Sequence, residues 1–187
     1  MRNICVYCSA SDKIAQTYVD EAIKLGEAIA KKGATLVYGG GNVGLMGKVA
    51  RSAQAHGAKV IGVIPERLVE REVVHRECDE LIITKTMRER KAIMDEKSEA
   101  FIALAGGFGT LDEIMEAITI RQLGFHQKPI VFLNSDGFYN HLLSFFEQLY
   151  NEGFASRKMT NHYQVAETVE EALSIVLGET NAHHRAT

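Results

Sequence analysis

The 187-residue chain is predicted to fold as an α/β domain in which a doubly wound parallel sheet carries helices on both faces. Short apolar segments of strand length alternate with amphipathic segments of helix length along the whole chain, as they do in α/β proteins. The strand segments are apolar at nearly every position, which is typical of parallel strands buried on both sides. No Pro- or Ser-rich linker and no repeat interrupts this alternation, so we expect a single domain over residues 1–180 and a flexible tail at 181–187.

The expected elements follow one another through short connections. In chain order they are a strand at 3–8, a helix at 13–32, a strand at 35–38, a helix at 44–56, strands at 59–64 and 81–84, a helix at 87–99, a strand at 100–104, a helix at 111–123, a strand at 130–133, and helices at 139–151 and 169–177. The apolar residues of the first helix recur at a spacing close to 3.6, at Ile14, Tyr18, Ala22, Leu25 and Ile29. Glycine, which readily ends a helix, follows four of the helices, at Gly33, Gly57, Gly124 and Gly153.

The composition excludes several classes of protein. Hydrophobic residues make up 46% and charged residues 24% of the chain, with only 2 prolines, which excludes a disordered or collagen-like chain. The longest apolar runs fall far short of the roughly 20 residues that cross a membrane, so we expect no membrane partner. The formal charge is -3 with both signs interspersed, which argues against a nucleic-acid partner. The first residues lack the apolar core of a secretory signal, so we expect a cytoplasmic protein.

The three cysteines are not expected to form disulfides or a metal centre. Their number is odd, in a chain without a secretory signal. Cys5-x-x-Cys8 has the spacing of half a zinc site, but no second Cys pair or spaced His pair completes four ligands. We therefore expect Cys5 and Cys8 to be small residues at the end of a strand, and the protein to hold no metal.

A first glycine loop, from Tyr38 to Gly47, follows the second strand and opens a helix. It contains G-x-G-x-x-G at Gly39, Gly41 and Gly44, where glycines let backbone N–H groups approach phosphate oxygens. Glu66 stands about 20 residues further on, where a dinucleotide site has an acid for the ribose. Because that fingerprint normally follows the first strand, a dinucleotide site, another kind of phosphate-binding loop and a merely structural turn all stay open.

A second glycine loop, at 105–110, also follows a strand and opens a helix. Two helix ends that suit anions on one sheet favour a phosphorylated small molecule as ligand. Neither loop ends in the Lys-Ser/Thr pair of nucleoside triphosphatases. Thr110-Leu111-Asp112-Glu113 also matches a capping box, in which Thr110 would cap the helix and Glu113 would reach back to it, so Glu113 has either a structural or a chemical role.

Two cations stand on a helix face that otherwise looks buried. Met87, Arg90, Lys91 and Met94 occupy positions i, i+3, i+4 and i+7. Either both side chains extend their charged ends to solvent, or they line a polar cavity and meet a phosphate or the carboxylate of Glu113.

Three motifs occur in a fixed order between Cys5 and about Phe154. They are Tyr38-Gly-Gly-Gly-x-x-Gly-Leu-Met-Gly47, Met87-x-x-Arg90-Lys91-x-x-Met94, and Ala-Gly-Gly-x-Gly-Thr-x-x-Glu113 followed by Gln122-Leu-Gly-x-His-x-Lys-Pro129. In this order and spacing they resemble the LOG ("Lonely Guy") family of cytokinin-activating phosphoribohydrolases. Members of that family were long labelled possible lysine decarboxylases, but no lysine here stands out as an anchor for pyridoxal phosphate.

The resemblance implies a Rossmann-like homodimer that hydrolyses the N-glycosidic bond of N6-modified adenosine 5'-monophosphates, and often of AMP, without a cofactor. Its products would be a free base and ribose 5-phosphate. Matching the motifs makes Arg90 and Glu113 the catalytic pair. The expected substrate-binding positions are Gly39, Gly40, Gly41, Glu72, Lys91, Gly106, Gly107, Phe108, Gly109, Thr110, Leu111, Asp112 and Thr119. The sequence departs from the family pattern at Ala105, at Ser9-Ala10-Ser11 and at Ile120, and we expect Ile120 to affect the pocket for an N6 substituent.

Two rival functions use the same glycine loops. A nucleotide or cofactor carrier would bind there without chemistry, but it has no need of both Arg90 and Glu113. An NAD-dependent oxidoreductase would use the fingerprint at Gly39, but the chain lacks a second domain for its substrate. The apolar face of the helix at 139–151 either completes the core or forms a dimer surface, through Leu142, Leu143, Phe145, Phe146 and Leu149.

Overall fold

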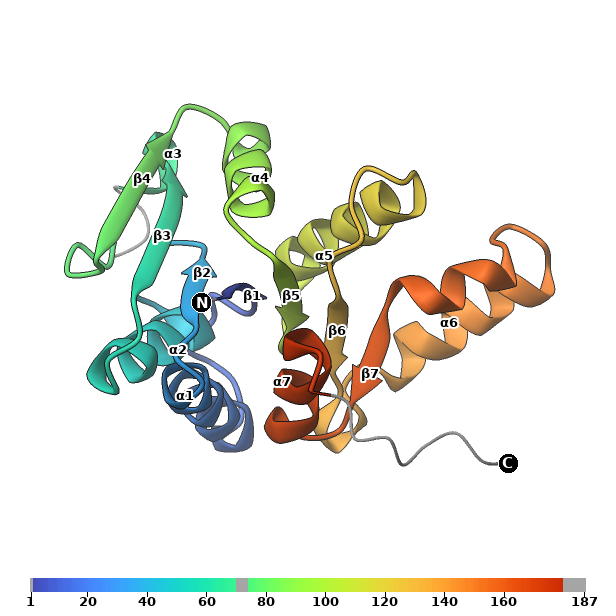
Figure 1. Cartoon of the computed structure of the whole chain (residues 1–187), viewed down its shortest axis with the longest axis horizontal. Coiled ribbons are helices and arrows are strands. Elements are labelled where there is room, and N and C mark those ends of the chain that lie inside the picture. Colours follow the sequence, from blue (N-terminus) through green and yellow to red (C-terminus); the bar gives the residue numbers. More distant parts are fainter. Residues whose placement is uncertain (1, 70–73, 180–187) are drawn as a thin grey trace.

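The strands in the described part of the chain form one parallel sheet of seven. The structure, a computed structural model, describes residues 2–69 and 74–179. The strands are β1 (Asn3–Tyr7), β2 (Thr35–Tyr38), β3 (Val60–Pro65), β4 (Glu80–Thr84), β5 (Ala100–Ala103), β6 (Ile130–Leu133) and β7 (Gln164–Ala166). They lie in the order β4-β3-β2-β1-β5-β6-β7, and each pairing is parallel (Figure 1). The predicted doubly wound parallel sheet is therefore confirmed.

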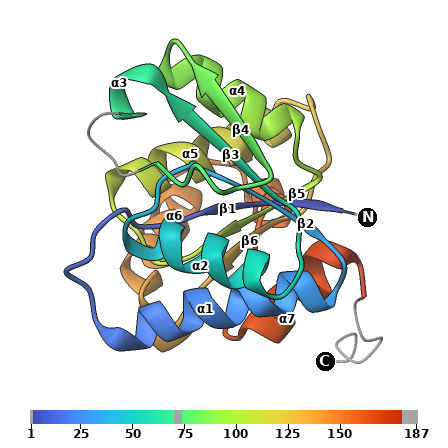
Figure 2. The ribbon, with the colours of Figure 1, turned by 90° about the vertical axis from the view of Figure 1, so that its left-hand side faces the viewer.

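Helices cover the two faces of this sheet. They are α1 (Gln16–Lys31), α2 (Gly44–Ala55), α3 (Glu66–Val69), α4 (Met87–Glu96), α5 (Phe108–Gln122), α6 (Asn140–Asn151) and α7 (Val169–Leu177), with 3-10 turns at Ser135–Gly137 and Arg157–His162. In Figure 2, α1 and α7 lie below the sheet and α4 lies above it. Within the two described ranges, no helix has the length and apolar character needed to cross a membrane.

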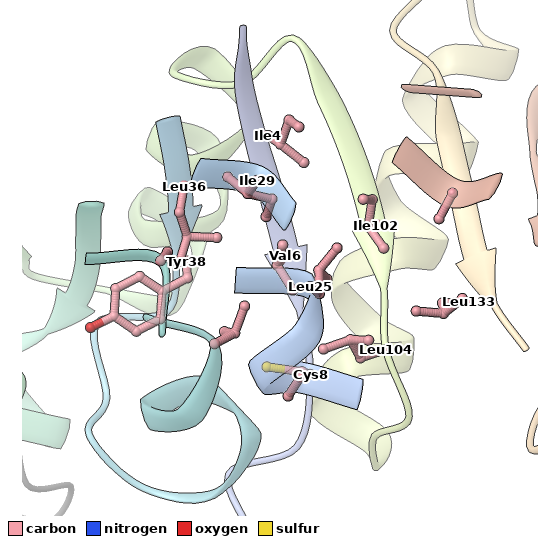
Figure 3. Packing of buried hydrophobic residues seen from close by; sticks show 14 of the residues in the cluster. Ile4, Val6, Cys8, Leu25, Ile29, Leu36, Tyr38, Ile102, Leu104 and Leu133 are labelled. Atoms are coloured by element: carbon pink, nitrogen blue, oxygen red, sulfur yellow. The ribbon is translucent and has the colours of Figure 1, made fainter. Parts of the chain in front are cut away.

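Successive residues of β1 enter two separate hydrophobic cores. Ile4 and Val6 pack with the residues of α1, α2 and α7, as the close view in Figure 3 shows for Leu25 and Ile29 of α1. Cys5 and Tyr7 point the other way, into the core formed with α4, α5 and α6. Burial on both faces explains why the strand segments of the sequence are apolar throughout rather than at alternate positions.

Several element boundaries differ from the sequence prediction. The first helix begins at Gln16 rather than at residue 13, because Ala15 is extended. The helix predicted to reach residue 99 ends at Glu96, since the N–H of Glu99 already donates to the Asn3 oxygen at the start of the central strand β1, at 2.8 Å. The one-turn helix α3 and the three-residue edge strand β7 were not predicted, because both are too short to show a periodic pattern. The tail expected at 181–187 lies outside the described residues.

Candidate active site

A cavity of about 250 Å³ lies at the carboxyl ends of the central strands. The chain runs from β1 toward one edge of the sheet and from β5 toward the other, so the loops after these two strands diverge and leave a crevice. The cavity is lined by Cys8, Ser9, Ala10, Met46, Leu68, Met87, Arg90, Gly107, Gly109, Thr110 and Glu113. It thus brings both predicted catalytic residues and part of the second glycine loop to one place.

Arg90 and Glu113 form a buried ion pair between α4 and α5. An Nη of Arg90 donates to Oε1 of Glu113, and Arg90 Nε donates to the main-chain oxygen of Val63 at 3.0 Å. Only 6% of Arg90 and 8% of Glu113 is exposed. Of the two alternatives for Arg90, extension to solvent is therefore wrong. Because burying two charges costs free energy that their attraction often fails to offset, such a pair is weak evidence for stability and better evidence for chemistry.

The charge state of Glu113 depends on two opposing effects. Burial raises the pKa of the Glu113 carboxyl, while the guanidinium of Arg90 lowers it, and burial has the larger effect. The resulting pKa lies above the ordinary value for glutamate. A carboxyl group whose pKa is raised holds a proton more readily, so it can accept one in one step and release it in the next.

The helix that carries Arg90 begins at a side-chain cap. The hydroxyl of Thr86 accepts the N–H of Glu89 at 3.1 Å, and the Glu89 carboxylate accepts the N–H of Lys85 at 2.8 Å. This Thr-x-x-Glu pattern was visible in the sequence but was not used to place the helix. The cap sets where α4 starts and therefore which of its residues face α5.

Lys91 joins α4 to the outer side of α5 rather than lining the 250 Å³ cavity. Its ammonium pairs with Glu116 and lies 3.0 Å from Asp112 Oδ2. Burial is the largest single effect on the pKa of Lys91 and lowers it, but the hydrogen bonds and the negative charges of these two carboxylates together raise it above its ordinary value, so Lys91 stays charged. A second cavity, of about 220 Å³, lies beside Lys91 and is lined by Tyr7, Lys91, Ala92, Asp95, Glu113, Glu116, Ala117 and Ile120. Glu113 therefore borders two cavities.

Four other predicted substrate positions share the outer side of α5. A surface hollow there is lined by Phe108, Leu111, Asp112 and Thr119, together with Arg88, Lys91, Met115 and Glu116. The Thr119 hydroxyl donates to the Met115 oxygen at 2.8 Å, within its own helix. The structure thus separates these four positions from the cavity that holds Arg90, and their contact with substrate remains a prediction.

The N-terminus of α5 presents free backbone donors to the 250 Å³ cavity. The helix begins at Phe108, after Gly107, and not at residue 111 as predicted. Within the described part of the chain, the N–H groups of Phe108, Gly109 and Thr110 have no hydrogen-bond acceptor. Unpaired donors and the helix dipole make this end of α5 suitable for an anion.

The capping-box interpretation of Thr110 and Glu113 is wrong. Thr110 lies inside the first turn of α5, and its side chain folds over Gly106, where an added Cβ would stand 2.1 Å from Thr110 Oγ1. The helix has no side-chain cap, and the carboxylate of Glu113 pairs with Arg90 instead. Gly106 is thus required by packing, and Glu113 is available for chemistry.

The N-terminus of α2, by contrast, is closed by the chain itself. The N–H of Gly44 donates to Asp12 Oδ1 at 2.9 Å, and the N–H of Leu45 donates to the Ser9 oxygen at 2.9 Å. Asp12 stands where a phosphate would stand in a dinucleotide-binding protein. Three alternatives were open for the first glycine loop. Where this loop enters α2, these contacts favour a structural turn over a phosphate-binding site. Glu66 is exposed in the first turn of α3.

Gly39, Gly40 and Gly41 contact the walls of the site. A Cβ on Gly39 would stand 2.2 Å from an Nη of Arg90, so the absent side chain leaves room for the guanidinium. The oxygen of Gly40 accepts the N–H of His75 at 3.1 Å, and Gly41 pairs with Val74. Contact of these glycines with substrate remains a prediction. Glu72, the last predicted binding residue, lies outside the described residues.

Five residues that line the cavity were not predicted as site residues, because their side chains suggest no particular chemistry. They are Cys8, Ser9, Ala10, Met46 and Leu68. The available signal was position, since Cys8 to Ala10 directly follow a buried strand. Cys5 is buried, and burial raises its pKa to about 12, which keeps it a neutral thiol. Among the described residues no group of three or more His, Cys, Asp and Glu side chains has the arrangement to hold a metal.

Comparison with known proteins identifies the family. A family profile described as "Possible lysine decarboxylase" matches residues 46–176. The cytokinin riboside 5'-monophosphate phosphoribohydrolase LOG2 of Arabidopsis thaliana is 45% identical over 155 residues, which are 83% of this chain and 73% of that protein. LOG3 of the same plant is 42% identical over 184 residues, 98% of this chain and 86% of that protein.

Among solved structures, the molybdenum cofactor binding protein from the phototrophic bacterium Rippkaea orientalis has a similar fold. It is 28% identical with a TM-score of 0.72, and the match covers 95% of this chain and 96% of that one. The identity to the plant proteins is higher, at 45% and 42%, and the match to LOG3 covers 98% of this chain. On these grounds the chain belongs to the LOG family.

Proposed function

We propose that the protein hydrolyses the N-glycosidic bond of adenosine 5'-monophosphates, including N6-modified ones, and releases the free base and ribose 5-phosphate. The observation that carries this proposal is the buried pair of Arg90 and Glu113 beside an uncapped helix N-terminus in a single cavity. The relatives are named as phosphoribohydrolases of cytokinin riboside 5'-monophosphates, which supports the reaction on N6-modified nucleotides.

The two ends of the cavity differ in a way that orients such a substrate. Free N–H groups at the start of α5 suit the phosphate. The thioether of Met46 and the side chains of Leu68 and Met87 offer an apolar surface to the base and to an N6 substituent. With the nucleotide held in this direction, the carbon C1' lies between these ends, next to Glu113.

The reaction then needs one activated water. Glu113 accepts a proton from the water while the water oxygen forms a bond to C1' and the C1'–N9 bond breaks. The departing base takes up a proton from solvent, and Glu113 releases its proton to solvent afterwards. The negative charge of Glu113 also stabilises the positive charge that develops on the sugar. Arg90 favours the ionised form of Glu113 against the effect of burial, and its hydrogen bond positions the carboxylate. Every step uses side chains of the protein and water, so the proposed reaction requires no cofactor.

We also infer that the protein acts as a homodimer, through the outer side of α5 and the loop that follows it. Phe108 at the start of α5, and Leu123 and Phe125 just after its end, are 92%, 64% and 78% exposed, so large apolar side chains reach solvent at both ends of this helix. Of the residues on α6, Phe146 is buried in the core and Phe145 is 51% exposed. Sedimentation of a double variant with Leu123→Asp and Phe125→Asp tests this surface, and a variant that stays dimeric contradicts it.

A carrier function is the second candidate, because a solved structure of the same fold is named for cofactor binding. Incubating the protein with AMP, N6-isopentenyl AMP and the two corresponding nucleosides, followed by chromatography, separates the two candidates. Hydrolysis predicts free base from the monophosphates alone, and no base from Glu113→Gln at an unchanged melting temperature. Binding of a nucleotide with no release of base from any substrate would favour the carrier.

A further inference from the structure

A lysine from the loop before β6 holds the far end of α4 to the sheet. Lys128 Nζ donates to the main-chain oxygen of Asp95 at 2.7 Å and to Asp95 Oδ1 at 3.0 Å. The same ammonium lies 5.6 Å from the centroid of the Phe101 ring in β5. Lys128 belongs to the motif at 122–129, to which the proposed reaction assigns no role. We call Lys128 and Asp95 the α4 clamp.

The position of α4 depends on such polar contacts. Of its ten residues, only Arg90 and Met94 are buried, so little apolar surface fixes the helix. The main-chain oxygen of Asp95 lies in the last turn of α4, where the helix dipole favours a cation. Lys128 supplies that cation, and the Phe101 ring beneath it limits where the ammonium can lie.

Neighbouring residues fix Lys128 itself. Arg121 donates to the main-chain oxygen of Lys128 at 2.7 Å, and the N–H of Lys128 donates to His126 Nδ1 at 3.2 Å. His126 Nε2 also faces Asp95 Oδ1, at 3.8 Å. Burial lowers the pKa of His126, so near neutral pH this ring is uncharged and Lys128 provides the positive charge that Asp95 needs.

The clamp lies close enough to the catalytic pair to affect it. Asp95 follows Lys91 by one helical turn, and both residues line the 220 Å³ cavity that Glu113 also borders. A helix transmits a shift along its axis, so a change at Asp95 moves Arg90 relative to Glu113. We propose that Lys128 is a positioning residue, which through Asp95 sets the place of α4 and thereby the contact between Arg90 and Glu113. This inference rests on the proposed function.

The test compares the wild type with Lys128→Met, which keeps an unbranched apolar side chain and removes the charge. Its matched control is Lys24→Met, which breaks an exposed ion pair of 2.9 Å with Glu170 on the opposite face of the sheet. For Lys128→Met we expect kcat for AMP to fall roughly tenfold or more, with KM within about twofold, because a misplacement of about 1 Å is enough to slow a positioned reaction. Lys128→Arg retains both donor contacts and restores most of the rate.

Hydrogen exchange provides a readout that does not depend on activity. The amides of α4 exchange faster in Lys128→Met and at the wild-type rate in Lys24→Met. If Lys128→Met does not fold, Asp95→Asn takes its place and gives a smaller fall in kcat, since the main-chain contact to Lys128 survives. An unchanged kcat, a rise in KM alone, or unchanged exchange in α4 would overturn the inference. A wild type that releases no base contradicts the proposed function, and the exchange of α4 then decides on the clamp separately.

Discussion

Gly39→Ala perturbs the catalytic pair without removing any functional group. A Cβ at this position would stand 2.2 Å from an Nη of Arg90 and 2.8 Å from Met46 Sδ. The nitrogen must retreat by about 1 Å to reach ordinary contact distance, and the guanidinium then turns away from Glu113. We expect kcat for AMP to fall on the order of 100-fold, because displacements of this size have such effects on positioned groups. Overpacking also costs about 1–3 kcal/mol of stability.

The control for Gly39→Ala is Gly26→Ala. Its Cβ would stand 2.4 Å from the Val49 oxygen, in the contact between α1 and α2, and no residue of α1 lines the cavity. Both variants are compared by kcat for base release and by melting temperature. Gly26→Ala loses stability but keeps the kcat of the folded enzyme. The reasoning is refuted if Gly39→Ala keeps the wild-type kcat, or if the two variants lose kcat in the same proportion to their loss of melting temperature.

Three further predictions concern pH and specificity. The value of kcat/KM rises as the pH increases through the raised pKa of Glu113, because the carboxylate is the active form. Removing the guanidinium in Arg90→Met raises this pKa further and shifts the rise to higher pH. A pH profile with no shift would contradict the pairing of Arg90 with Glu113. Met87→Ala lowers kcat/KM for N6-isopentenyl AMP roughly tenfold more than for AMP, and equal losses would place the N6 substituent elsewhere. Burial lowers the pKa of His75, whose Nδ1 lies 3.1 Å from the Tyr38 hydroxyl. The unfolded chain therefore binds a proton more readily than the folded one, and the free energy of unfolding decreases as the pH falls below about 6.5. Urea titrations at about pH 7.5 and 5.5 measure this decrease, which we expect to be smaller in His75→Gln.

The parts of the fold that could be predicted from sequence are those with a local cause. The segments at 35–38 and 130–133 were predicted with the bounds that the structure has, because continuous burial leaves a continuous apolar run. Thr110 to Glu113 shows the limit of local patterns. These residues match a helix cap, but Thr110 packs on Gly106 and Glu113 pairs with an arginine 23 residues earlier, and no local pattern reports either contact.

The site was predictable only as far as its motifs reach. Arg90 and Glu113 each belong to a sequence motif, and the structure places them in contact. Starting α5 at Phe108 instead of residue 111 changed which residues of its first turn are free to meet an anion, and this start depends on the extended backbone of Gly107. The self-capping of α2 by Asp12 required knowing that the loop after β1 folds over the loop after β2, a tertiary contact between segments 32 residues apart.

The central place of the first strand has a consequence for synthesis of the protein. In Figure 1 the N-terminal strand β1 lies in the middle of the sheet, between β2 and β5. On the ribosome, β1 can pair with β2 early, but its other edge stays open until residues 100–103 are made. At roughly 5–20 residues per second this takes several seconds. Throughout that time the nascent half-sheet presents an unpaired apolar edge, Ile4 to Tyr7, to other chains. The interval of greatest aggregation risk is therefore set by the order of the strands and precedes completion of the domain.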